Sequence, residues 1–487
     1  MRLAGIINSM KPTNYIIFVI FTAFFAGAAT ESFAQWSADT KISVSDTNAV
    51  LSENADICLA ASGDSVHAVW WDTKNDSTAI FYRHSYDGGI TWASPKRITS
   101  PSKSVDLPSI AISGSMVHVS YRNNADSGSY YIRSSDGGNT WGNPVSLGTY
   151  YFWPSIAASG SNVFIGFNSS ISGNSEVYFR RSTDNGSTWS QTFQISNALK
   201  RSEDQSLSAS GSYIHFVWND NRTGIMQTWY RRSSDNGITW GPETQLTNAA
   251  LFAYFPMVNA QGANIDVVRG DRDAANNFHI MYTHSIDFGS TWSTEQELSN
   301  NATSSAYPVV KRDGQNVHAL WYDFNDDMYY RRSTDGGVTW EAAQSLVSAA
   351  NKPAKPFIAI SGPTLHVIWI DKREGHPEVY YKRYVSVDTT TQASVSPANG
   401  LVNLLEITPN PVSNYATLKL SVLSHLEDVK INFYDAAGRL SQTQLVGGLN
   451  EGLQSIPLIL PQISGIAFLR IIAKGMVIGT SDMIIVR

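Results

Sequence analysis

The sequence predicts an all-β chain: a seven-bladed β-propeller closed by its N-terminal strand, followed by a small Ig-like β-sandwich. The first observation is an eight-residue motif, Ser-x-Asp-x-Gly-x-Thr-Trp, which occurs six times at intervals of 48 to 52 residues. A fixed period of this size is typical of repeat architectures. Four strands of ~6 residues with connections of similar length fill ~48 residues, which matches one propeller blade.

The motif itself has the chemistry of a tight turn. An aspartate carboxylate accepts hydrogen bonds from turn N–H groups, glycine allows positive φ, and tryptophan buries a large ring between sheets. We therefore expect structural roles for the motif aspartates, which are Asp87, Asp136, Asp184, Asp235, Asp287 and Asp335.

A longer unit around the motif occurs seven times. Each unit has an apolar strand, a turn at a glycine, a second apolar strand and a tyrosine-rich third strand. The seventh unit, Pro356 to Tyr384, has no motif and no fourth strand, whereas residues 35–43 align with the motif tryptophan and the strand that follows it. We expect this N-terminal strand, with Trp36, to pair beside Tyr380 and Tyr381. Such closure removes the exposed edges of an open sheet array.

Two sets of connections are expected to form one rim of the propeller. Many Asp, Arg and aromatic residues fall there, and this mixture suits sugars, because aromatic rings cover apolar sugar faces and charged groups bind hydroxyls or a carboxylate. The same aspartates are also good turn residues, so both interpretations stay open. The candidate rim residues are Asp72, Arg122, Trp153, Asp220, Arg222, Arg269, Asp271, Arg272, Asp323, Asp371 and Arg373.

The fifth unit departs from the others. Arg269 stands where the other units have an aromatic residue, and Asp271 and Arg272 follow it. Two arginines there are suited to grip an anionic sugar; the alternative is a loop with internal ion pairs. A column of five histidines occupies one slot on five different units, so these side chains cannot converge on one metal. We expect no metal and no cofactor.

The six motifs resemble the Asp-boxes, or bacterial neuraminidase repeats, of sialidase-like propellers, over most of the chain. The resemblance implies that each box joins the third and fourth strands, on the face opposite the ligand. It identifies a fold better than an activity, since such boxes occur in sialidases, other enzymes and lectins. The Arg-Ile-Pro tripeptide of sialidases is absent; the nearest string, Arg97-Ile-Thr, follows the first box. Whether the chain is an enzyme stays open.

The N-terminus and the composition indicate an exported protein. Residues 1–34 have the positive charge, the apolar run and the small-x-small site of a signal peptide. Later segments are not apolar enough to span a bilayer, so we expect no integral membrane protein. The net charge of −6 argues against nucleic-acid binding. We expect a secreted or surface-attached propeller, 35–384, that binds glycans or acts as an adhesive module; the alternative is a sialidase-like exo-glycosidase with a divergent active site.

A different module is expected after the propeller. Residues 385–406 read as a linker, and 407–487 contain Pro-Asn-Pro, then Tyr-Asp-x-x-Gly-Arg, then Ser-Gly-Ile-x-Phe-x-Arg-Ile. This order resembles the C-terminal sorting domain of the type IX secretion system, although Ala467 stands where that family usually has tyrosine. The resemblance implies the type IX machinery as a partner, export, and then removal of the domain or surface anchoring. The alternative is an Ig-like binding module that stays attached.

Overall fold

The structure is a computed structural model with strands as its regular elements. No helix occurs among the residues it describes, and these contain no helix able to cross a membrane. The predicted signal peptide and 386–401 of the predicted linker lie outside the described residues. The described ranges are 35–43, 49–50, 58–74, 77–100, 105–247, 252–299, 304–324, 327–347, 353–362, 364–385, 402–408, 416–434, 440–461, 465–474 and 476–485.

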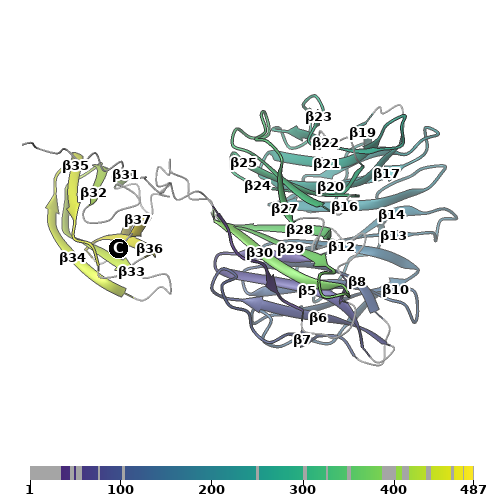
Figure 1. The fold of residues 1–487 in the computed structure, drawn as a ribbon, viewed down its shortest axis with the longest axis horizontal. Helices are drawn as coiled ribbons and strands as arrows, with labels where there is room; N and C mark the ends of the chain where they lie inside the picture. Colours follow the sequence, from purple (N-terminus) through teal and green to yellow (C-terminus); the bar gives the residue numbers. More distant parts are fainter. Residues whose placement is uncertain are drawn as a thin grey trace, which may run out of the picture. The chain divides into compact units, whose positions relative to one another are not determined.

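Up to Val385 the strands form repeated antiparallel sheets, arranged as in a β-propeller (Figure 1). The first has the order β3-β5-β6-β7, with β4 also pairing with β5; its strands are β3 (Ala49–Val50), β4 (Leu59–Ser62), β5 (Ser65–Lys74), β6 (Ser77–Ser85) and β7 (Lys96–Arg97). The next two contain β8 (Val105–Ser113), β9 (Met116–Asn123), β10 (Gly128–Ser134) and β11 (Val145–Thr149), then β12 (Tyr151–Ser159), β13 (Asn162–Ser169), β14 (Glu176–Ser182) and β15 (Phe193–Gln194).

Three further sheets repeat the same order of four strands. They contain β16 (Ser202–Ser210), β17 (Tyr213–Asp220), β18 (Gln227–Ser233) and β19 (Thr244–Gln245); β20 (Ala253–Gln261), β21 (Asn264–Arg272), β22 (Phe278–Ser285) and β23 (Gln296–Glu297); and β24 (Ser305–Asp313), β25 (Asn316–Asp323), β26 (Asp327–Ser333) and β27 (Gln344–Val347).

The last repeated sheet combines both ends of this region. Strands β28 (Ala354–Ser361), β29 (Thr364–Asp371) and β30 (Glu378–Val385) are joined by β1 (Gln35–Trp36) and β2 (Thr40–Lys41), which both pair with β30. Trp36 is in register with Tyr384, and Thr40 with Tyr381. The pairing that the sequence predicted for the N-terminal strand is therefore present.

The N-terminal segment makes the same contacts as the fourth strands of other sheets. Val379 N–H donates to Ser43 Oγ at 2.9 Å, just as Val177 donates to Ser196 at 2.8 Å. Motif tryptophans pack edge-on against an aromatic ring of the preceding sheet, as Trp141 does on Tyr82. Trp36 occupies this position too, because it meets Tyr330 edge-on at 5.2 Å. Trp92, in the motif of the first sheet, packs in the same way on Tyr381 of the last sheet, with ring centroids 4.9 Å apart.

Aromatic side chains fill the space between neighbouring sheets. Trp70, Trp218, Trp321 and Trp369 are at most 1% exposed, and each comes from a second strand. Burial of a large aromatic side chain contributes about 1.5–3 kcal/mol, so each of these residues adds substantially to the stability of the core. Cys58, the chain's single cysteine, is also fully buried.

The C-terminal region has two sheets with one shared apolar core. Fully buried Leu418 and Leu420 come from one sheet, and Ile431, Phe433 and Leu469 from the other. Strand β31 already begins at Val402, within the segment predicted as a linker. The sheets have the orders β31-β32-β35 and β34-β33-β36-β37, made of β31 (Val402–Thr408), β32 (Ala416–Val422), β33 (Leu426–Tyr434), β34 (Leu440–Leu449), β35 (Gly452–Leu458), β36 (Gly465–Ala473) and β37 (Met476–Ile485).

Candidate functional site

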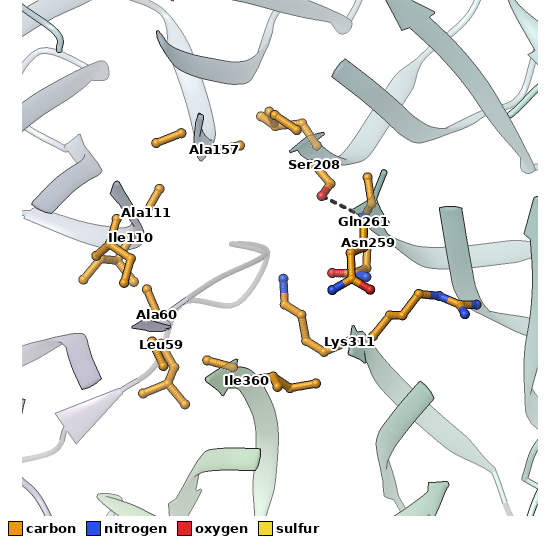
Figure 2. Close-up of a pocket in the computed structure, with 18 residues that line it drawn as sticks. Leu59, Ala60, Ile110, Ala111, Ala157, Ser208, Asn259, Gln261, Lys311 and Ile360 are labelled. Carbon is orange, nitrogen blue, oxygen red and sulfur yellow. Dashed lines mark hydrogen bonds between the residues drawn. The ribbon is translucent and has the colours of Figure 1, made fainter. Parts of the chain in front are cut away.

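The first strands of the repeated sheets surround a central channel. Each first strand contacts the next, and β28 contacts β4. Figure 2 shows the side chains of these strands around the open centre. In the first six sheets the hairpin after the first strand hydrogen-bonds to the motif turn of the same sheet; Gly137 N–H, for example, donates to Ser115 O at 2.9 Å. The first strands therefore end at the face that carries the motif turns, named the motif face, and begin at the opposite face.

Near their beginnings, six of these first strands contain the same β-bulge. The ladder to the second strand skips two residues, for example between Tyr254 and Met257. The first skipped residue has a φ between 49° and 52°, in the left-handed region. Bulky residues rarely adopt this conformation, which costs of order 1–3 kcal/mol and collects at binding sites. The six residues, named the bulge ring, are Leu107, Trp153, Asp204, Phe255, Tyr307 and Lys355.

The bulge ring combines aromatic, acidic and basic side chains at the channel mouth opposite the motif face. All except the buried Leu107 are partly exposed. Phe255 and Tyr307 lie with ring centroids 4.7 Å apart. Aromatic faces of this kind cover the apolar face of a sugar ring, while a carboxylate and an ammonium bind its polar groups.

Two carboxyl groups in β16 have pKa values raised by burial, those of Glu203 and Asp204. The Asn219 amide, which donates to Asp204 at 3.2 Å, acts in the opposite direction. Glu203 pairs with Arg201 at 2.6 Å. A carboxyl group with a raised pKa keeps its proton to higher pH, so Asp204 is suited to donate as well as to accept a hydrogen bond.

An aromatic cluster extends from the bulge ring along the fifth repeated sheet. Tyr254 contacts Phe255 at 6.1 Å and Phe278 at 5.5 Å between centroids. The Arg272 guanidinium lies 5.8 Å from the Phe252 ring and 5.9 Å from the Phe278 ring. Arg272 Nε is buried without a hydrogen-bond partner. Arg272 thus has an unused buried donor beside aromatic faces.

The predicted rim carboxylates lie at the ends of the second strands but take part in the turns. Asp220 and Asp371 are fully buried, and each accepts the N–H of the residue two positions on, at 2.7 and 2.8 Å. Asp72 and Asp323 are each 2% exposed. The bonds of Asp220 and Asp371 stabilise the turns between the second and third strands, which is the role that the alternative interpretation of the sequence gives to them.

Three of the predicted rim arginines are held by neighbouring acidic groups. Arg122 binds Asp106 through two nitrogens, at 2.7 and 2.5 Å. Arg222 pairs with Asp220 and lies 4.0 Å above the Trp229 ring, and Arg373 pairs with Asp371 and lies 4.1 Å above the Tyr380 ring. Arg222 and Arg373 thus share one arrangement, in which an acid and an aromatic ring of the third strand hold the arginine.

Arg269 lies in the core and not on a surface rim. Its side chain is fully buried, and it binds both oxygens of Asp271, at 2.8 and 2.9 Å, and Glu295 at 2.8 Å. It takes the place that buried aromatic residues occupy in neighbouring sheets, and its ion pairs through Nε and Nη2 offset the cost of burying its charge, whereas Nη1 has no hydrogen-bond partner. The ion pairs of Arg269 with Asp271 and Glu295 match the alternative interpretation, a loop with internal ion pairs. Because the Arg269 side chain is committed to these pairs, it is not available to bind an anionic sugar together with Arg272.

One group beside the N-terminal strand has the geometry to hold a cation. Possible ligand atoms of Glu374, His376 and Glu378 lie within 4.8 Å of one another. The Lys41 ammonium already lies 2.7 Å from Glu374 and 3.1 Å from Glu378. A lysine therefore supplies positive charge at this position and ties β2 to the last repeated sheet.

The six motif aspartates have a common set of bonds. In the second motif, Asp136 accepts from Thr140 N–H at 2.8 Å and from its hydroxyl at 2.6 Å. Hydrogen bonds from Thr140 lower the pKa of Asp136 to about 2. The Tyr82 ring leaves no room for a Cβ at Gly138, where φ is +96°. This geometry accounts for the Asp-x-Gly spacing and commits the carboxylate to the turn.

Comparison with known proteins does not assign the chain to a family. No family model and no curated protein matches it. Among solved structures, the polysaccharide lyase Uly1 has 10% identity and a TM-score of 0.47, covering 69% of this chain and 91% of that chain. A mutant Trypanosoma rangeli sialidase displaying trans-sialidase activity has 10% identity and a TM-score of 0.41, covering 93% and 91%. The β-propeller domain of the Trilobed protease from Pyrococcus furiosus has 10% identity and a TM-score of 0.44, covering 69% and 93%.

Proposed function

We propose that this chain is a secreted or surface-attached glycan-binding propeller whose sugar ligand rests on the bulge ring. The observation that carries the proposal is the presence of Trp153, Phe255 and Tyr307 at the same strained backbone position. Backbone strain that recurs at the same position of several sheets is typical of a functional site. Three aromatic side chains around the channel mouth are suited to stack on carbohydrate rings. Asp204 and Lys355 supply polar contacts, and Arg272 offers a donor to a sugar carboxylate.

A glycan array with residues 35–487, followed by calorimetric titration of the best glycan, tests this function. Replacing Trp153, Phe255 or Tyr307 by alanine should weaken binding at least ~10-fold, because each removes a stacking face at the centre of the site. Tyr86→Ala is the matched control, since Tyr86 is 48% exposed and belongs to a motif turn. Unchanged affinity in all three bulge-ring variants would reject the site.

The second candidate function is a sialidase-like exo-glycosidase with a divergent active site. The raised pKa of Asp204 favours it, because a protonated carboxyl group can act as a general acid. A fluorogenic sialoside should then be hydrolysed by the wild type but not by Asp204→Asn. Binding without turnover supports the lectin-like function instead.

We also propose that the repeated sheets are the seven blades of an Asp-box propeller, spanning 35–384, and that the last blade is completed by the N-terminal strand. The pairing of β1 and β2 with β30 and the edge-on packing of Trp36 and Trp92 support this count. Replacing Trp36 by alanine should lower the unfolding midpoint as much as replacing Trp141, its counterpart in the second motif. A much smaller loss for Trp36 would argue against an equivalent seventh blade.

For the C-terminal region we propose an Ig-like sorting domain, 407–487, that is read by the type IX secretion machinery after signal-peptide cleavage. Its support is the sequence resemblance, together with a separate apolar core that allows it to fold as a module. Deleting 407–487 should trap the propeller in the periplasm. If the truncated protein reaches the medium as efficiently as the full chain, the sorting role is wrong and an attached binding module is favoured.

A further inference from the structure

Exposed apolar side chains gather beside the bulge ring on the third repeated sheet, which contains β12, β13 and β14 (Figure 1). Tyr150 and Phe152 lie at the start of β12, Ile171 follows β13, and Leu199 precedes β16. First strands begin and second strands end at the face opposite the motif face, so all four residues lie at the face of the bulge ring. Tyr150, Ile171 and Leu199 are 63%, 57% and 100% exposed, and Phe152 is partly exposed. These four residues are named the apolar strip.

The inner part of the apolar strip adjoins the bulge ring. The Phe152 ring contacts the ring of Trp153, with centroids 6.3 Å apart. Tyr151, the residue before Phe152, pairs with Ser169 at the end of the second strand. The Ile171 N–H donates to the Ser169 hydroxyl at 3.4 Å, which keeps the hairpin of Ile171 close to this pair. A ligand that rests on Trp153 therefore has the apolar strip next to it.

The outer part of the strip is tied to the same hairpin by Asn174. The Asn174 amide donates to the backbone oxygen of Ala198 at 3.0 Å and to that of Lys200 at 2.8 Å. Leu199 stands between these two residues, so its backbone is held beside the hairpin of Ile171. The strip is thus a continuous surface, and contiguous exposed apolar residues mark interaction sites, whereas single ones are ordinary.

The hairpin of the third sheet differs in chemistry from the equivalent hairpins of the fourth and last sheets. The turn is the same in all three, because a glycine N–H closes each one at 3.0 or 3.1 Å. Two residues before that glycine, the fourth and last sheets have Arg222 and Arg373, each held by an aspartate and an aromatic ring. The third sheet has Ile171 there, and 170–175 contain no charged residue. The same turn thus presents an apolar side chain to the ligand.

We propose that the ligand of the bulge ring is an amphipathic glycan, a sugar that carries an alkyl or acyl chain as a glycolipid headgroup does. This inference rests on the proposed glycan-binding function: the sugar stacks on the bulge ring, and the chain lies along the apolar strip. Each methylene group that leaves water for the strip strengthens binding. A longer oligosaccharide fits less well, because the aliphatic side chains of Ile171 and Leu199 offer neither aromatic faces for sugar rings nor partners for hydroxyl groups.

Calorimetric titration of residues 35–487 tests the proposal with two probes, the methyl and the hexyl glycoside of the sugar that binds best on the glycan array, both below micellar concentrations. The hexyl glycoside should bind at least ~10-fold more tightly, a difference of about 1.4 kcal/mol. The double variant Ile171→Ser, Leu199→Ser should lose this preference and keep the wild-type affinity for the methyl glycoside. Ile238→Ser is the matched control and should keep the preference, because Ile238 is 62% exposed but belongs to a motif turn on the opposite face.

Thermal melts establish that each variant is folded. Equal affinity of the wild type for the two glycosides overturns the inference and leaves glycan binding at the bulge ring intact. A preference for the hexyl glycoside that the folded double variant retains also overturns it. A gain in affinity for a trisaccharide but not for the hexyl glycoside would replace the amphipathic ligand by a polymeric glycan. If no glycan on the array binds, the proposed function fails and this inference fails with it.

Discussion

The fifth repeated sheet differs from its neighbours at a buried polar position between the second and third strands. In five other sheets a histidine shares a hydrogen bond with a tyrosine there, as His118 does with Tyr131 at 2.6 Å. In the fifth sheet Asp266 replaces the histidine, accepts from Tyr282 at 2.7 Å and binds Arg312 from β24. The third sheet uses two phenylalanines, Phe164 and Phe179. The common backbone therefore accepts a neutral histidine–tyrosine pair, an ion pair or an apolar pair at this position.

The sharpest way to break this comparison is to remove one member of the ion pair. Arg312→Met leaves Asp266 buried without its cation and should lower the free energy of unfolding by about 3–5 kcal/mol. Urea unfolding at pH 7, followed by tryptophan fluorescence, measures the loss. The double variant Asp266→His, Arg312→Ile copies the common arrangement and should recover most of it. A single variant as stable as the wild type would show that the ion pair is not needed.

Acid should affect the histidine sheets. Burial lowers the pKa of His67 and His118 to about 4, and of His215, His318 and His366 to about 3. Between these values and an unfolded pKa near 6.5, the unfolded chain binds more protons than the folded chain. The stability from neutral burial is therefore present above pH 6.5 and is lost as pH falls, by up to about 1.4 kcal/mol per pH unit for each histidine.

Unfolding free energies measured between pH 7 and pH 5 test this slope. The variant His118→Phe, Tyr131→Phe copies the phenylalanine pair of the third sheet and should remove about one proton from the pH dependence. An unchanged slope, or a wild type that gains stability on acidification, would contradict the neutral burial of these histidines.

The sequence predicted the repeats and the closing strand because their signals are local and strong. Trp36 could be aligned with the motif tryptophans, and the Asp-x-Gly spacing follows directly from the turn geometry. Trp153 was predicted as a rim residue, but the backbone bulge that all members of the bulge ring share was not predicted. A proline follows Leu107, Trp153, Phe255, Tyr307 and Lys355 in the sequence. Because a proline favours an extended conformation in the residue before it, this pattern does not predict the left-handed φ that is observed. The partners of Arg269 depend on three-dimensional packing that no spacing reveals.

The smallest effect is expected where all sheets agree. Asp87→Ala removes the hydrogen bonds from Thr91 and Ile90 to the carboxylate and should cost about 1 kcal/mol, like the loss of a capping side chain. Asp287→Ala in the fifth sheet should shift the unfolding midpoint by the same amount, because its turn has the same bonds. Glycan affinity should not change in either variant. If Asp287→Ala lowers the unfolding midpoint more than Asp87→Ala does, the fifth sheet also differs from the others in its motif turn.

The join between β1, β2 and β30 has a consequence for the order of events along the chain. Ser37 is hydrogen-bonded to Arg383, 346 residues away, so β1 cannot pair until β30 has been synthesised. Each doubling of the length of such a loop adds only about 0.6 kcal/mol to the entropy cost of closing it, so this pairing is stable at equilibrium although it forms late. Gln35 and Val385 are paired neighbours. A pulling force applied at these two residues would therefore separate β1 from β30 before it disrupted the other sheets.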